Sequence, residues 1–329
     1  MAVARRAPSS SRFRARAGFV GAVVVAAGVA APAASAHAGS SSRAHLASAW
    51  EAPPLVLAGA ALALALFAQA FVRLRRRGRT DLAPWTRVPL FAAAIVLGVL
   101  ALVSPLDAAG DDYLLSAHML QHVVIGDVAP ALAVLALRGP LVFFFLPARV
   151  LRRVAVLRPL RAMLAFALRP WVALTLWAVG MLAWHVPAAY DYAATHQGIH
   201  DLEHATFVVV GTLAWVLLVD PAKHRRLRVP GRILFALGML TLSHPIVDGM
   251  FFSSPAYPHY ADRPDRLFGF SPTTDQKLAA VTMFVEQMVT LGTCIAVLGW
   301  PYVRRWRAER GTAAAGGEAT GEIRTGVIR

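Results

Sequence analysis

Long apolar runs alternate with short polar or basic connections along most of the chain. Seven runs have the length of a membrane-crossing helix, at residues 54–72, 88–106, 114–137, 171–186, 202–219, 233–249 and 278–300. A helix rises about 1.5 Å per residue, so each run can cross the ~30 Å hydrocarbon core of a bilayer, the fourth with help from its flanks. The pattern predicts an all-α fold, in which residues 54–303 form a polytopic, seven-helix transmembrane bundle within a lipid bilayer.

The two ends of the chain differ from this pattern. Residues 1–36 begin with arginines, continue as an apolar stretch and finish at "ASA", an order typical of a secretory signal peptide, with an uncleaved first span as the alternative. Residues 37–53 form an outer N-terminal segment. Residues 304–329 form a tail that becomes small, polar and aperiodic after Gly311, and we predict that this tail is cytoplasmic and disordered.

Basic residues predict the orientation of the bundle. The connections 73–87, 138–169 and 223–232 and the tail each hold at least five Lys or Arg residues, whereas the other connections hold few or none. The positive-inside rule assigns the basic connections to the cytoplasm, so we expect the N-terminus outside and the C-terminus inside. This topology explains the net charge of +15 in a chain that is 57% hydrophobic, and no nucleic-acid partner is expected.

Histidines gather on the opposite, outer side. His118 and His122 in "SAHMLQHVVIGDVAPAL" are four residues apart, on one face of the third span. Polar side chains are costly in hydrocarbon and usually face the bundle interior, and neutral imidazole is a common metal ligand. We predict that the histidines at the outer ends of four spans bind a metal: His118, His122, His185, His204 and His244.

Further side chains nearby are weaker candidates for the same site: Met119, Glu203, Met283, Glu286, His200 and, if cleavage after Ala36 makes it the first residue, His37. The single cysteine, Cys294, excludes a thiolate pair within one chain. Histidine and methionine without thiolate favour copper, although packing alone is the alternative for Met119 and Met283. Asp127, deep in the third span, and Glu286 serve either a proton path or a helix–helix hydrogen bond.

Other functions remain open on the residues alone. "HDLEH", from His200 to His204, matches the H-x-x-E-H motif of zinc peptidases. The soluble scaffold of that class is missing, and we do not expect an enzyme. Facing histidines can also ligate haem, in an electron-transfer protein or a haem chaperone. Asp127 and Glu286 can line an ion pathway.

Several motifs together resemble the CtaG family of seven-span membrane proteins, which assist assembly of caa3-type cytochrome c oxidase. They are "SAHMLQHVVIGDVAPAL", "WHVPAAYDYA", "HDLEHATFVVVGTLAW", "SSPAYPHY" and "TDQKLAAVTMF", within residues 50–300. The resemblance implies a copper chaperone of the bacterial plasma membrane, with oxidase subunits and a copper donor protein as partners. It carries over His118, His122, His185, His204, Asp275, Gln276 and Lys277. Asp127, Glu286 and His244 depart from its pattern.

Overall fold

The computed structural model of the chain describes residues 43–325, and these residues contain helices and connections without β-strands. The predicted signal peptide, residues 1–36, and His37 lie outside the described residues. The helical elements, in chain order, are η1 (Arg43–Ser48), α2 (Pro54–Arg76), η2 (Thr80–Leu82), α3 (Arg87–Val103), α4 (Pro105–Asp112), α5 (Leu115–Val123), η3 (Val124–Val128), α6 (Ala129–Ala136), α7 (Leu141–Phe144), α8 (Ala148–Val156), α9 (Arg158–Ala167), α10 (Pro170–Trp184), α11 (Pro187–Thr195), α12 (Gln197–Val219), α13 (Val229–Phe252), α14 (Pro258–Ala261), η4 (Leu267–Gly269) and α15 (Pro272–Thr325).

The long apolar helices confirm an all-α polytopic membrane protein. Within the described residues, six helices are long and apolar enough to cross a membrane, and there are seven if the bent pair α9 and α10 counts as one span. These two helices meet at 76°, because Pro170 starts α10 and holds the preceding Arg169 in an extended conformation. The fourth predicted span therefore corresponds to a 15-residue helix that depends on its flank for length.

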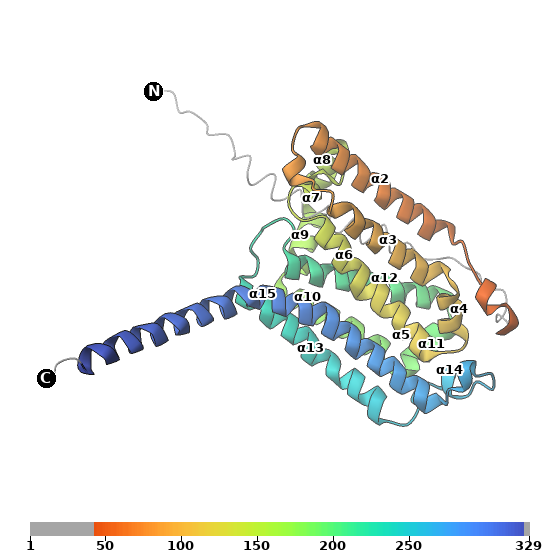
Figure 1. Cartoon of the computed structure of the whole chain (residues 1–329). Coiled ribbons are helices and arrows are strands. Elements are labelled where there is room, and N and C mark those ends of the chain that lie inside the picture. The colour runs from red at the N-terminus through yellow and green to blue at the C-terminus, as the bar shows by residue number, and fades with distance from the viewer. Residues whose placement is uncertain (1–42, 326–329) are drawn as a thin grey trace.

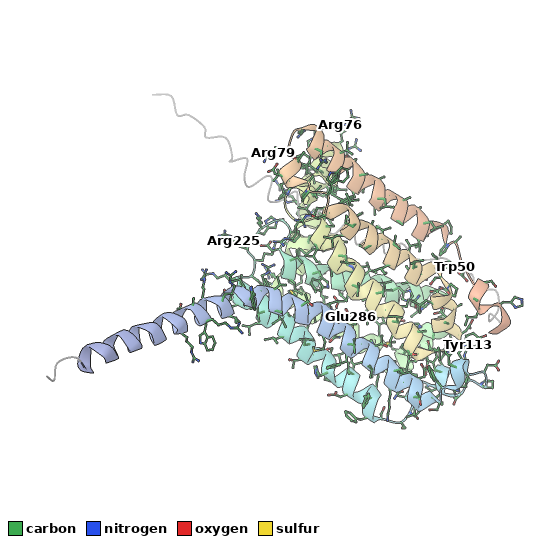
Figure 2. All side chains as sticks on the ribbon, in the orientation of Figure 1. Trp50, Arg76, Arg79, Tyr113, Arg225 and Glu286 are labelled. Atoms are coloured by element: carbon green, nitrogen blue, oxygen red, sulfur yellow. The ribbon has the colours of Figure 1, made fainter. Side chains whose placement is uncertain are left out.

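The helices form a bundle in which neighbours along the chain pack side by side (Figure 1). The unit α5–η3–α6 lies centrally, against α3 on one side and against α12 and α15 on the others; α10 packs on α12 and α13, and α13 on α15. The short helices α4, α11 and α14 cover one end of the bundle. The labelled Arg76, Arg79 and Arg225 lie at the opposite end from Trp50 and Tyr113 (Figure 2).

The third span is interrupted by the π-helix η3. Pro130 lies just after this π-helix and has no N–H. The carbonyl group of Gly126, four residues before Pro130, therefore cannot accept the usual α-helical hydrogen bond. That carbonyl faces α12 at Gly211, where an added β-carbon would collide with its oxygen. A glycine at position 211 thus lets α12 approach the π-helix closely.

The last helix is longer than the sequence analysis predicts. The predicted seventh span covers residues 278–300, whereas α15 runs from Pro272 to Thr325. The tail contains several alanines, and it extends a helix that already exists, so no costly helix nucleus has to form. The predicted disorder of the tail, residues 304–329, stays a prediction.

Candidate metal centre

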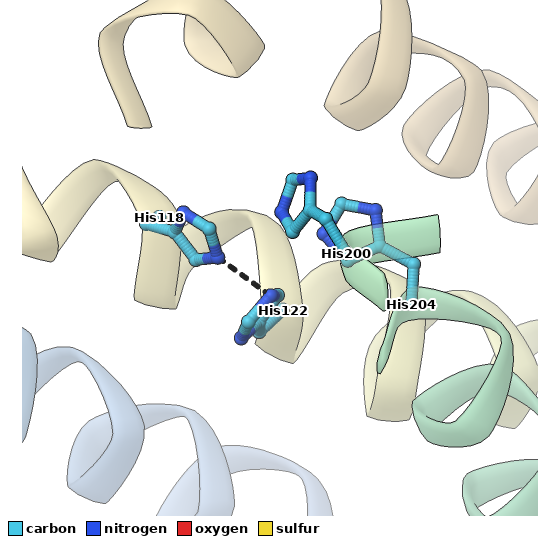
Figure 3. A group of neighbouring side chains, drawn as sticks. All are labelled: His118, His122, His200 and His204. Atoms are coloured by element: carbon cyan, nitrogen blue, oxygen red, sulfur yellow. Dashed lines mark hydrogen bonds between the residues drawn. The ribbon is translucent and has the colours of Figure 1, made fainter. Parts of the chain in front are cut away.

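Two helices bring four histidines together near the end of the bundle that α4, α11 and α14 cover. His118 and His122 lie one turn apart on α5, and His200 and His204 lie one turn apart on α12 (Figure 3). Each residue offers one ring nitrogen, and these four nitrogens all lie within 4.8 Å of one another. We call these four side chains the outer histidine group.

The four rings pack directly against one another. Nε2 of His118 lies 2.8 Å from Nε2 of His122, and the ring centroids of His200 and His204 are 4.2 Å apart. Between the helices, His118 meets His200 at 5.2 Å and His122 meets His204 at 5.1 Å, centroid to centroid. His118, His122 and His200 are buried, and His204 is half-buried. Such a concentration of imidazole nitrogen is the donor set that borderline metal ions prefer.

Tyr260, in α14, fixes the tautomer of His118. Its hydroxyl donates to the carbonyl oxygen of Gly110 at 2.7 Å and lies 3.1 Å from Nδ1 of His118. Burial raises the pKa of Tyr260 well above its usual value, so the hydroxyl keeps its hydrogen. Since that single hydrogen goes to Gly110, Nδ1 of His118 must donate to the tyrosine oxygen. Nε2 of His118 therefore carries the lone pair and faces the other histidines.

The same reasoning fixes the tautomer of His122. Because Nε2 of His118 accepts, Nε2 of His122 donates the hydrogen in the 2.8 Å contact between them. Nδ1 of His122 then carries the lone pair, and this buried atom has no hydrogen-bond partner. His122 thus has one ring nitrogen in the outer histidine group and the other turned away from His118.

Two carboxylates lie close to the outer histidine group. Oδ1 of Asp111 lies 3.6 Å from Nδ1 of His118 and 3.7 Å from Nε2 of His200. Oε1 of Glu203 lies 3.9 Å from Nε2 of His122, with both side chains buried. Negative charge beside neutral imidazoles favours a bound cation. Tyr260 was not among the predicted site residues, because it lies in the short helix α14, far along the chain from His118.

The other predicted ligands take different places. His185, Met119, Met283 and Glu286 line a cavity directly beside His122. His244 is exposed and places its Nδ1 2.6 Å from the carbonyl oxygen of Leu240 in its own helix, so the structure does not bring it to the outer histidine group. His200, a weaker candidate in the sequence, is one of the four clustered rings.

The polar trio of α15 holds the bundle together at its covered end. Asp275 accepts hydrogen bonds from the backbone N–H groups of Leu115 and Ser116, at 2.8 and 3.0 Å, and so caps the start of α5. Gln276 donates to the carbonyl oxygen of Met250 at 2.8 Å. Lys277 is exposed and lies over the ring of Phe251. The contacts of Asp275 position the helix that carries His118 and His122.

Asp127 joins three elements by hydrogen bonds. It accepts from Trp215 of α12 and, at 2.8 Å, from the hydroxyl of Thr290 of α15. Glu286 lines the same cavity as Asp127. The sequence leaves open a proton path or a helix–helix hydrogen bond for Asp127. The hydrogen bonds to Trp215 and Thr290 are of the second kind.

Comparison with known proteins bears directly on the resemblance found in the sequence. The sequence model of the family described as cytochrome c oxidase caa3 assembly factor (Caa3_CtaG) matches residues 65–305. No curated protein and no solved structure gives a significant match to the chain. The family match covers α3 to α13 whole and most of α2 and α15, including every residue of the outer histidine group. The chain therefore belongs to the Caa3_CtaG family of cytochrome c oxidase assembly factors.

Proposed function

We propose that this chain is a non-enzymatic assembly factor that binds copper at the outer histidine group and supplies it to a subunit of cytochrome c oxidase. The observation that carries the proposal is the convergence of four imidazole nitrogens within 4.8 Å, from two helices, in a largely buried site. Unpaired polar groups in such a place are costly. A bound cation would satisfy Nε2 of His200 and of His204, neither of which has a hydrogen-bond partner.

The orientation predicted from the basic connections supports delivery from the outer face of a bacterial plasma membrane. The outer histidine group lies in the N-terminal parts of the span Leu115–Ala136 and of α12, and the labelled arginines lie at the other end of the bundle (Figure 2). By the positive-inside rule, the histidine end faces away from the cytoplasm. A copper donor protein on that side could load the site without carrying the ion across the bilayer.

The packing of the four rings favours an ion over a haem. A macrocycle between facing helices would have to separate the rings of His118 and His200, whose centroids are 5.2 Å apart, or those of His122 and His204, at 5.1 Å. A peptidase role for the "HDLEH" segment is also disfavoured: His200 and Glu203 are buried, and a metal that hydrolyses peptides needs an open position that a substrate can reach.

Metal analysis of the full chain, purified in detergent, tests the proposal. The wild type should retain copper after gel filtration, whereas the double variant His118→Ala/His122→Ala should lose most of it. His196→Ala is the matched control, because His196 is an exposed histidine at the start of α12 and should not affect copper content. The double variant should also fail to restore oxidase activity in cells that lack the chain. Copper retained by a correctly folded double variant would overturn the ligand assignment.

A further inference from the structure

A cavity of about 40 Å³ lies between helices of the bundle and is lined by His122 but not by His118. It is bounded by α5, α10, α12 and α15 and is lined by methionine, histidine and acidic side chains. A volume of ~10–15 Å³ is enough for one water molecule, so the cavity has room for a metal ion. We call it the inner chamber; it shares only His122 with the outer histidine group.

Two ring nitrogens with free lone pairs line the inner chamber. Nδ1 of His185 lies 2.8 Å from the carbonyl oxygen of Met181 and must donate to it, because a carbonyl oxygen has no hydrogen to give. Nε2 of His185 therefore carries the lone pair, and this buried atom has no hydrogen-bond partner. Nδ1 of His122 also carries a lone pair and has no hydrogen-bond partner. Both residues line the chamber and are less than a tenth exposed.

Three thioether sulfurs lie at the same cavity. Met119 of α5, Met181 of α10 and Met283 of α15 all line it, and they belong to one packed cluster. Thioether is a soft ligand that selects Cu(I), and the flexible methionine side chain can adjust to an ion.

The charge of the chamber also suits a monovalent cation. Histidine and methionine ligands are neutral, so a Cu(I) ion bound only by them leaves one positive charge inside the bundle. Asp127 and Glu286 line the same chamber. An ionised carboxylate on either residue carries one negative charge. That charge offsets the ion and lowers the cost of burying it.

We propose that the inner chamber is a second copper site, selective for Cu(I) and held by His122 and His185 with sulfur from Met119, Met181 and Met283. This inference rests on the proposed function in one respect, that copper enters through the outer histidine group. His122 offers one lone pair at a time, so the two sites share a ligand. An ion passes between them when its bond to Nε2 of His122 breaks and a bond to Nδ1 forms, while the ring proton moves from Nδ1 to Nε2.

X-ray absorption on the detergent-purified full chain, loaded with Cu(I) under anaerobic conditions, tests the proposal. The wild type should show sulfur as well as nitrogen around copper. Met119→Leu/Met283→Leu keeps side-chain volume and should lose most of the sulfur signal and hold Cu(I) more weakly against a chelator. Met288→Leu, a methionine of α15 that does not line the chamber, is the matched control and should match the wild type. Gel filtration and thermal unfolding check that each variant folds.

The outcomes separate the inner site from the outer one. Cu(I) bound through nitrogen alone in the wild type, and unaffected by the methionine double variant, would overturn the inner site and leave the proposed function intact. A sulfur signal that persists in His118→Ala/His200→Ala supports the inner site by itself. If that variant also binds Cu(I) and Cu(II) as tightly as the wild type, the outer site is overturned and the inner one stands. A wild type that binds neither ion would overturn both.

Discussion

The hydroxyl of Tyr260 lies 3.1 Å from Nδ1 of His118 and thereby decides which nitrogen of that histidine faces its neighbours. Partners of this kind orient metal-binding histidines and keep them in the right tautomer, and their loss typically costs about 10- to 100-fold in metal affinity. The contact joins the loop before α15 to the outer histidine group.

Replacing Tyr260 by phenylalanine should therefore weaken copper binding at the outer histidine group by about 10- to 100-fold without removing a ligand. The measurement is a competition titration of the purified variant against a copper chelator. Tyr192→Phe, at an exposed tyrosine of α11, is the control and should bind as the wild type does. An unchanged affinity for Tyr260→Phe would show that the tyrosine does not position His118.

His244→Ala should leave copper content and affinity unchanged. His244 follows Ser243, which is buried and donates to Gln287 at 2.6 Å. One residue corresponds to a turn of about 100° around a helix, so His244 points away from the bundle interior. The test is to measure the copper content of His244→Ala and of His118→Ala side by side. If His244→Ala lost as much copper as His118→Ala, His244 would be a copper ligand.

Gly211→Ala should destabilise the bundle, because the new methyl group would meet the carbonyl oxygen of Gly126 in the π-helix. Overpacking of this kind costs about 1–3 kcal/mol or more, since backbone atoms must move. A drop in the thermal unfolding temperature in detergent would measure it. Gly292→Ala is the matched control, because a β-carbon there would meet nothing within 4 Å. Equal unfolding temperatures would contradict the close approach of α12 and η3.

Asp275→Ala should lower stability by about 0.5–2 kcal/mol, the usual cost of losing a helix N-cap. The carboxylate accepts from two N–H groups at the start of α5 and, at 2.5 Å, from the hydroxyl of Ser116. The unfolding temperature should fall, and copper affinity should fall with it because α5 carries two ring ligands. Asp265→Ala, at an exposed acid in the preceding loop, should change neither quantity. A variant of Asp275 as stable as the wild type would refute the cap.

Much of the fold follows from the hydrophobic pattern alone. The predicted third span, 114–137, corresponds to residues 115–136 in the structure, and the predicted fifth, 202–219, lies within α12. The family was also identifiable from its motifs in and between these spans. The match over residues 65–305 confirms it. Apolar runs are decisive here because a bilayer leaves a backbone few alternatives to a helix.

The candidate site was only partly predictable. The spacing of His118 and His122 places them on one face in any helix, and the structure brings His204 to that pair. The sequence could not distinguish His200, which joins the group, from His244, which does not. Both lie near outer helix ends, and only the rotation of each helix about its axis separates them.

The sequence by itself therefore determined that the chain enters a membrane as helices and that histidines gather at one end of these helices. Both conclusions follow from the cost of polar groups in hydrocarbon and from the local spacing of residues. The tertiary structure alone decided which side chains meet. The π-helix at η3 and the glycine contact between α12 and Gly126 set how the central helices approach each other. That packing brings Asp127, Glu286 and His122 to one chamber, because the rotation and depth of each helix depend on side chains that interlock from distant parts of the chain.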